Sequence, residues 1–198
     1  MARALDLLGD RWTLMILRDL CSGPWRFSDL LAGLGGIGPN LLSARLALLV
    51  EQGLVAHREN RYQLSGRGQA VRPLMRELMV FGKVLGGPGL DDDRTVPART
   101  AMGVLFDPIA ARGQSLNVSV KVEQEQFAML VADGALTFVS GPSPVAADVT
   151  LEATREAFEA AGRGESNGNF HLRGHASALQ CFRQLFSLPV DRLQRLME

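Results

Sequence analysis

The sequence predicts an α+β fold in two parts, of which the first is mostly helical and the second contains a mainly antiparallel sheet. Three observations predict this class. Apolar residues recur at helical spacing through most of residues 2–52, and the spacing changes to that of strands after Gly53. Residues 86–100 have the Gly, Pro and charge content of a linker. Apolar and polar residues then alternate over residues 116–122, as in a half-buried strand.

These observations predict domains at residues 1–86 and 97–198, joined by a linker at residues 87–96. The charge is unevenly distributed between the halves: residues 1–86 hold 11 Lys/Arg against 7 Asp/Glu, a net +4, which leaves −4 for residues 87–198. This asymmetry indicates that only the first half meets a polyanion.

The composition, 46% hydrophobic and 21% charged, is that of an ordinary globular protein. Cys21 and Cys181 lie far apart in sequence and lack metal-ligand spacing, so we expect free, reduced thiols. The sequence shows no stretch of membrane-spanning length and no signal-peptide pattern, which predicts a cytoplasmic protein.

Two helices are predicted first, at residues 2–8 and 12–20, separated by Gly9-Asp10-Arg11. Asp10 is suited to cap the second helix. The stripe formed by Trp12, Ile16 and Leu20 predicts a core face.

A short helix opening at Phe27, a glycine-rich turn at residues 35–38 and a longer helix at residues 39–49 follow. Pro39 suits the first turn of this longer helix, and Gly53 suits its C-terminal end. A short helix, a turn and a second helix form a helix-turn-helix pattern.

Residues 54–58 and 61–65 read as two strands joined by Glu59-Asn60, a two-residue hairpin connection. A helix-turn-helix followed by a hairpin is a winged helix, and a further helix is predicted over residues 66–85.

In a winged helix, the second helix of the helix-turn-helix enters a DNA groove. An ordinary amphipathic helix fits residues 39–49 equally well when they are considered alone. Arg45 can offer a bidentate fork to guanine or bind phosphate, or it can form a salt bridge within the domain. Asn40 and Ser43 can contact DNA or cap the helix. The residues that we predict to contact DNA are Arg26, Ser28, Pro39, Asn40, Ser43, Ala44, Arg45, Arg58 and Arg61.

Five segments in this order resemble the HxlR family of bacterial, MarR-like winged-helix transcriptional regulators: Leu5–Leu14, Arg26–Leu30, Pro39–Leu46, Gly53–Val55 and Tyr62–Leu64. The resemblance covers roughly residues 3–85. It implies a homodimer whose interface is formed by the helices near residues 2–8 and 66–85. The hairpin is shorter than the family pattern, which leaves Arg58 and Arg61 for phosphate contacts.

The spacing of apolar residues in the second half of the chain predicts three further helices and five strands. Helices are expected at residues 97–111, 152–161 and 176–186. Strands are expected at residues 116–122, 127–131, 136–139, 148–151 and 170–173, with a hairpin at Asp133-Gly134.

The order of these elements, with Ala147–Leu151 before an acidic helix and then Gly168–Leu179, is similar to the sterol-carrier-protein-2 (SCP2) family. The resemblance implies an α/β domain around an apolar cavity that binds a small hydrophobic ligand, whereas a filled core is the alternative. The residues that we predict to line such a cavity are Phe106, Val120, Phe127, Met129, Phe138, Phe158, Phe170, Phe182 and Phe186.

No catalytic, cofactor or metal motif is evident in the sequence. His171 and His175 have the spacing of some metal ligands, but Gly174 breaks the segment and the sequence shows no third ligand nearby. We therefore expect that the chain is not an enzyme and that it binds neither a cofactor nor a metal ion.

The sequence as a whole predicts a dimeric transcriptional regulator that binds a pseudo-palindromic DNA operator under the control of a small hydrophobic effector. The alternative is a lipid or metabolite carrier that uses its helix-turn-helix for dimerisation and protein contacts.

Overall fold

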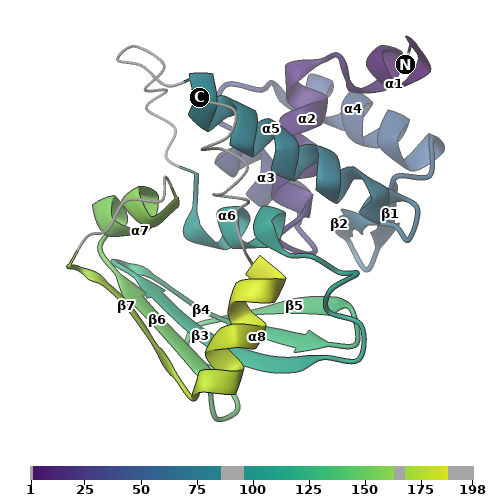
Figure 1. Ribbon diagram of the computed structural model, residues 1–198. Helices are drawn as coiled ribbons and strands as arrows, with labels where there is room; N and C mark the ends of the chain where they lie inside the picture. The colour runs from purple at the N-terminus through teal and green to yellow at the C-terminus, as the bar shows by residue number, and fades with distance from the viewer. Residues whose placement is uncertain (1, 86–95, 163–167, 187–198) are drawn as a thin grey trace. The chain divides into compact units, whose positions relative to one another are not determined.

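The computed structural model describes residues 2–85, 96–162 and 168–186 (Figure 1). The chain divides into two compact units, Met1–Arg76 and Glu77–Glu198. Helices and one hairpin build the first unit, and helices with a larger sheet build the second, so the predicted α+β class is confirmed. The predicted linker at residues 87–96 lies outside the described residues, except for Val96.

The elements of the first unit follow the predicted order. They are α1 (Ala2–Leu8), α2 (Arg11–Leu20), α3 (Phe27–Gly33), α4 (Pro39–Glu51), β1 (Val55–Arg58), β2 (Arg61–Leu64), the 3-10 helix η1 (Gly68–Val71) and α5 (Arg72–Leu85), which continues past Arg76. Apolar side chains of α2, α3 and α4 form the core, and of the predicted stripe Ile16 and Leu20 are buried while Trp12 is half-buried. Core side chains with at most 1% of their surface exposed include Ile16, Leu20, Leu30, Leu34, Leu42, Leu46 and Leu49.

The predicted hairpin is confirmed, with Arg58 opposite Arg61 at the turn. Glu59 and Asn60 have φ values of 49° and 58°, which is the left-handed conformation that a tight two-residue turn requires. A contact that the sequence did not predict extends this small sheet. The backbone N–H of Trp25 donates to the Tyr62 carbonyl at 2.9 Å, and the Tyr62 N–H donates back to the Trp25 carbonyl at 2.7 Å.

The helix predicted over residues 66–85 instead begins with the 3-10 turn η1, and α5 starts at Arg72. Ser65 fixes this junction, because its hydroxyl donates to the Gly53 carbonyl at 2.6 Å and accepts the Gly68 N–H at 2.9 Å. A Cβ on Gly68 would lie 1.9 Å from the Leu54 carbonyl oxygen. The chain therefore passes too close to the hairpin for a larger residue here.

The second unit is built on a five-stranded sheet of order β5-β4-β3-β6-β7. Its elements are α6 (Ala98–Leu105), β3 (Ser115–Val122), β4 (Glu125–Ala132), β5 (Ala135–Ser140), β6 (Val149–Ala153), α7 (Arg155–Gly162), β7 (Phe170–Gly174) and α8 (Ala176–Phe186). Three strand pairings are antiparallel, and β3 pairs with β6 in parallel, so the sheet is mixed but mainly antiparallel.

One face of this sheet carries the core of the second unit. Leu116, Val118, Val120 and Val122 alternate along β3 and are at most 2% exposed. They pack with apolar residues of α6 and α8 in a single hydrophobic cluster, and α8 lies across the sheet in Figure 1.

Two helix predictions in this unit were wrong at one end. The helix predicted over residues 97–111 ends at Leu105. Asp107 precedes Pro108, which disfavours helical backbone, and its carboxylate accepts the N–H groups of Ile109 and Ala110 in a turn.

The helix predicted over residues 152–161 starts only at Arg155. Glu152 and Ala153 stay in β6, where they pair with both neighbouring strands. Thr154 then begins the helix, because its hydroxyl accepts the Ala157 N–H at 3.2 Å.

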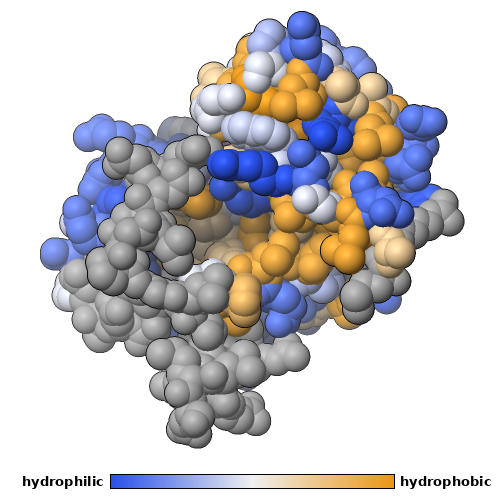
Figure 2. All heavy atoms as spheres, turned by 90° about the horizontal axis from the view of Figure 1, so that it is seen from above, coloured by the Kyte–Doolittle hydropathy of each residue, from blue (hydrophilic) through white to orange (hydrophobic). Residues whose placement is uncertain are grey.

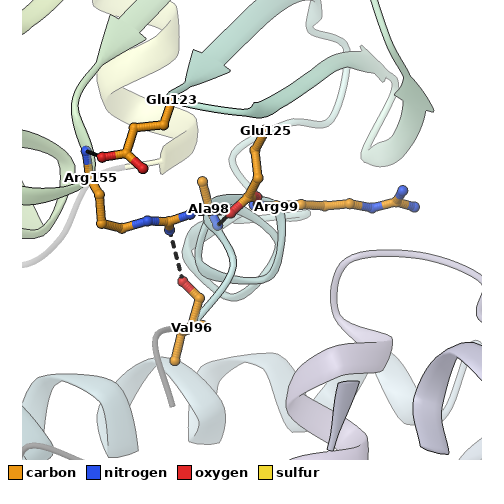
Figure 3. Close-up of polar contacts among 6 residues, drawn as sticks. All are labelled: Val96, Ala98, Arg99, Glu123, Glu125 and Arg155. Atoms are coloured by element: carbon orange, nitrogen blue, oxygen red, sulfur yellow. Dashed lines mark hydrogen bonds and ion pairs between the residues drawn. The ribbon is translucent and has the colours of Figure 1, made fainter. Parts of the chain in front are cut away.

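The hairpin between β3 and β4 supplies a carboxylate to the start of α6 (Figure 3). Glu125 accepts the backbone N–H groups of Ala98 at 3.2 Å and Arg99 at 3.4 Å. The Arg155 guanidinium pairs with Glu125 and also donates to the Val96 carbonyl at 3.4 Å. The chain that enters α6 is therefore fastened to the sheet.

The same hairpin also caps α7. Glu123, at the turn, accepts the backbone N–H of Arg155 at 3.1 Å, as Figure 3 shows. One hairpin thus fixes the starts of two helices that lie far apart in sequence.

Candidate nucleic-acid interface

Helix α4 has one buried face and one exposed polar face. Leu42, Leu46 and Leu49 are at most 1% exposed and hold the helix against the domain core. Asn40 and Ser43 are exposed on the other side. The predicted residues Pro39 and Ala44 are exposed with them, and Pro39 occupies the first turn.

The start of α4 is not capped by a side chain. Its capping residue is Gly38, which has none, so the structure gives Asn40 and Ser43 no capping role. Unbonded amides at a helix start favour an anion, and a DNA phosphate is one. The exposed face and the uncapped start lie at the same end of the helix.

Arg45 lies on the flank of α4 and not on its outer face. Its Nη2 lies 3.2 Å from Oδ2 of Asp10, and both side chains are 31% exposed. The salt bridge that was the alternative role for Arg45 is therefore present, and its partner comes from the capping position of α2. The sequence identified both residues but could not pair them across 35 positions.

Two predicted contacts lie at the start of α3, the supporting helix. Arg26 occupies the capping position in an extended conformation, and its side chain is exposed and makes no capping hydrogen bond. Ser28 is also exposed, and its hydroxyl donates to the Asp29 carboxylate at 3.1 Å. The Arg26 guanidinium is thus available to an external anion.

Arg58 and Arg61 face each other across the hairpin at its turn, and both are exposed. Like charges in directly opposite positions destabilise a strand pair. Within the described part of the chain, neither guanidinium has an ion-pair partner. An added anion, such as a phosphate, would relieve this repulsion.

A buried polar cluster joins the end of α2 to Trp25 and to the start of α5. The indole N–H of Trp25 donates to the Asp19 carbonyl at 2.9 Å, and Arg72 donates from Nη2 to the Cys21 carbonyl at 2.9 Å. Burial raises the pKa of the Asp19 carboxyl, although the neighbouring Arg18 opposes the shift. The sequence analysis missed this cluster, since no residue spacing links Arg72 to Cys21.

Cys21 is a buried free thiol in this cluster. Burial raises its pKa to about 11, although the nearby Arg72 charge acts in the opposite direction. The thiol is therefore protonated near neutral pH, where a metal-binding or redox-active cysteine would need to be a thiolate.

The nine residues predicted to line a ligand cavity all belong to the core of the second unit or pack against it. Phe106, Val120, Phe127, Met129, Phe182 and Phe186 are buried, whereas Phe138, Phe158 and Phe170 are partly buried. Several rings are in contact, with centroids of Phe106 and Phe186 5.6 Å apart and those of Phe182 and Phe186 5.1 Å apart. The structure thus brings these side chains together.

Among the residues that the structure describes, no three His, Cys, Asp or Glu side chains gather in a way that could hold a metal ion. His171 and His175 are both exposed. Within the same residues, no helix has the length and apolar character needed to cross a membrane.

The helix-turn-helix, the hairpin and the exposed face of α4 define a winged-helix protein of the DNA-binding class. Residues 7–88 match the family described as HxlR-like helix-turn-helix. The uncharacterized HTH-type transcriptional regulator YdzF of Bacillus subtilis is 34% identical over 93 residues, which cover 42% of this chain and 84% of YdzF. The chain belongs to the HxlR-like helix-turn-helix family.

Two other relatives match a similar share of the chain. An uncharacterized HTH-type transcriptional regulator of Mycobacterium tuberculosis is 39% identical over 87 residues, which cover 40% of this chain and 54% of the relative, so the chain spans about half its length. The quinone-bound structure of YodB from Bacillus subtilis has 29% identity and a TM-score of 0.40, covering 41% of this chain and 93% of YodB. The family match, at residues 7–88, includes most of the first unit.

Proposed function

We propose that this chain is a DNA-binding transcriptional regulator whose helix α4 enters a DNA groove. The observation that carries the proposal is the exposed, uncapped polar start of α4, which is held on a core of buried leucines. Such a helix presents its N-terminal residues to base edges while its buried face keeps it rigid. Membership of the HxlR-like family supports the same function.

The predicted DNA contacts divide into two kinds. Asn40 and Ser43 carry hydrogen-bonding groups on the outer face of α4 and are the candidates for reading bases. Arg26, Arg58 and Arg61 are exposed cations at the edges of the domain and are the candidates for binding phosphates. Ala44 offers a methyl group for apolar contact with thymine.

The test is a titration of the full chain with a duplex from upstream of its own coding sequence, at about 50 and 200 mM salt. Binding that weakens steeply with salt supports phosphate contacts. Asn40→Ala should reduce the preference for this duplex over a scrambled one, whereas the control Gln124→Ala should not. Salt-insensitive binding, or no binding, would overturn the proposed function.

We further propose that the regulator works as a homodimer through α1 and α5. Leu74, Leu78 and Phe81 lie at helical spacing on α5 and are 39%, 41% and 56% exposed, and Leu5 on α1 is 60% exposed. Figure 2 shows apolar side chains at the surface on the face seen from above. A dimer would place two copies of α4 about 34 Å apart, to match successive turns of a pseudo-palindromic operator.

Light scattering on the purified chain tests the dimer. Phe81→Glu should convert the native dimer into a monomer, because it places a charge in the apolar interface. Val145→Glu is the matched control, since Val145 is also an exposed apolar residue, at 48%, but lies between β5 and β6, away from α1 and α5 in the sequence. A native monomer, or a dimer that tolerates Phe81→Glu, would contradict the interface.

The second unit is proposed as an SCP2-like domain that takes a small hydrophobic effector among its aromatic residues. Support comes from the gathering of Phe106, Phe182 and Phe186 beneath the sheet. An effector would regulate DNA binding by preferring one arrangement of the two units. Native mass spectrometry of the purified chain, and thermal shifts with a fatty acid and an aromatic acid, test this. Absence of both an added mass and a shift would argue against an effector.

A further inference from the structure

Arg45 is the only basic residue of α4. It lies between the buried face formed by Leu42, Leu46 and Leu49 and the outer face that carries Asn40. A side chain on this flank points toward the edge of a groove when the outer face meets the bases. Phosphates line that edge.

Asp10 holds the Arg45 guanidinium at one point. Oδ2 of Asp10 accepts from Nη2 of Arg45 at 3.2 Å. The other carboxylate oxygen, Oδ1, accepts the backbone N–H of Thr13 at 3.1 Å and its hydroxyl at 3.4 Å. Because Thr13 is fully buried, these bonds fix the Asp10 carboxylate in one orientation.

The guanidinium uses only part of its donor capacity in this arrangement. Its Nε is buried and has no hydrogen-bond partner in the described part of the chain. The side chain as a whole remains 31% exposed. Since a guanidinium carries five N–H donors, N–H groups at its Nη end remain for an external acceptor.

We infer that Asp10 is a positioning residue for DNA binding, because it orients Arg45 so that the remaining Nη donors meet a DNA phosphate. The inference rests on the proposed function and adds to it a residue that does not itself contact DNA. It also assigns Arg45 to the backbone and not to a base edge. Fixing a long side chain before binding reduces the entropy lost on binding.

The sign of the effect separates this role from simple electrostatics. Removal of a carboxylate near a polyanion should tighten binding if Asp10 acts only through its charge. If Asp10 orients Arg45, its removal should weaken binding instead.

The experiment measures the affinity of the full chain for the upstream duplex and for a scrambled duplex, at two salt concentrations. Asp10→Asn keeps an oxygen that can cap α2 but removes the anion that holds Arg45. Asp10→Ser is a second variant that also preserves the cap. Glu51→Gln is the control, since it removes one negative charge from the exposed C-terminal end of α4, the helix that carries Arg45.

We expect Asp10→Asn to weaken binding to both duplexes about fivefold, with no further loss when it is combined with Arg45→Ala. Arg45→Ala should lower the slope of log affinity against log salt by about 0.9 and leave the preference between the duplexes unchanged. Glu51→Gln should leave binding unchanged or tighten it. Thermal unfolding followed by tryptophan fluorescence checks that each variant folds.

Tighter or unchanged binding by Asp10→Asn, or an equal loss in the Arg45→Ala background, would overturn the inference while native DNA binding still stands. A loss of duplex preference in Arg45→Ala would overturn the phosphate assignment. Absence of salt-dependent binding by the native chain would overturn the proposed function and the inference together.

Discussion

The two units differ in where they direct their chemically distinctive side chains. The first unit exposes cations and amides, such as Arg26, Asn40 and Arg58, around a core of leucines. The second unit directs its aromatic residues inward, as Phe106 and Phe186 show. The first arrangement suits an external polyanion, whereas the second suits either an apolar ligand or a filled core. The family match covers residues 7–88, most of which belong to the outward-facing unit.

Both units use carboxylates at helix starts, but the carboxylates serve different purposes. Asp10 caps α2 and, with its second oxygen, holds a cation of the helix proposed to bind DNA. Glu123 and Glu125 cap two helices that flank the inward-facing core. A cap in the first unit thus also serves a surface, while the caps in the second unit serve the packing of its core.

The largest expected effect separates the cores of the two units. Met129→Ala removes a fully buried side chain from the second core and should cost about 2–5 kcal/mol of its stability. Both tryptophans, Trp12 and Trp25, lie in the first unit. Far-UV circular dichroism should therefore show an earlier transition, while the tryptophan fluorescence midpoint stays constant.

The matched control is Ile109→Ala, at a residue that is 69% exposed in the same unit, which should change stability by less than about 0.5 kcal/mol. An equal shift of the fluorescence midpoint in Met129→Ala would show that the units unfold together, and the comparison would fail.

The reverse experiment alters the buried polar cluster of the first unit. Arg72→Met should lower the stability of the first unit by about 3 kcal/mol. The Arg72 guanidinium donates to the Cys21 carbonyl and to the Gln69 amide oxygen, and the substitution leaves both acceptors unpaired. Tryptophan fluorescence should report the loss. Arg67→Met, at an exposed position, serves as the control. A variant as stable as the native chain would mean that water replaces the guanidinium.

The cysteines provide one chemical probe in each unit. Cys21 is fully buried, and burial raises its pKa to about 11. Cys181 is only partly buried, and this lesser burial also raises its pKa. Because the thiolate is the form that reacts and Cys21 is also shielded from the reagent, Cys21 should be alkylated much more slowly than Cys181 at pH 8. Peptide mass spectrometry after timed alkylation measures both rates. Equal rates in the native chain would contradict the packing around Cys21.

The smallest expected effect concerns the caps of the second unit. Glu125→Gln keeps one acceptor for the start of α6 but loses the ion pair with Arg155, and should cost about 1 kcal/mol. Glu159→Gln removes an exposed charge from α7 and is the control. Circular dichroism should show a small shift for the first variant alone. Equal shifts would indicate a general effect of charge.

Helices and strands with a strong periodicity of apolar residues could be predicted from the sequence, because such an element buries its apolar side whichever elements pack against it. The leucines of α4 and the alternating valines of β3 are examples, and Glu59-Asn60 marked its hairpin through turn chemistry. The helix end at Leu105 was missed although Asp107-Pro108 signals it in the sequence, whereas the start at Arg155 depends on strand pairing that only the tertiary fold supplies.

Within the candidate site, the sequence identified the exposed residues of α4 but not what holds Arg45. The Asp10 pair and the Trp25–Tyr62 bridge join segments that only the tertiary fold brings together. Residue types indicate which side chains can bind an anion, whereas their orientation depends on such distant partners.

Hydrogen–deuterium exchange of the full chain, with and without the upstream duplex, tests the central claim most directly. The account predicts slower exchange at the start of α4, near residues 39–45, and at the hairpin around Arg58 and Arg61, with β3 to β6 unchanged. Protection confined to the second unit, or none at residues 39–45, would contradict the proposal that α4 is the helix that reads DNA.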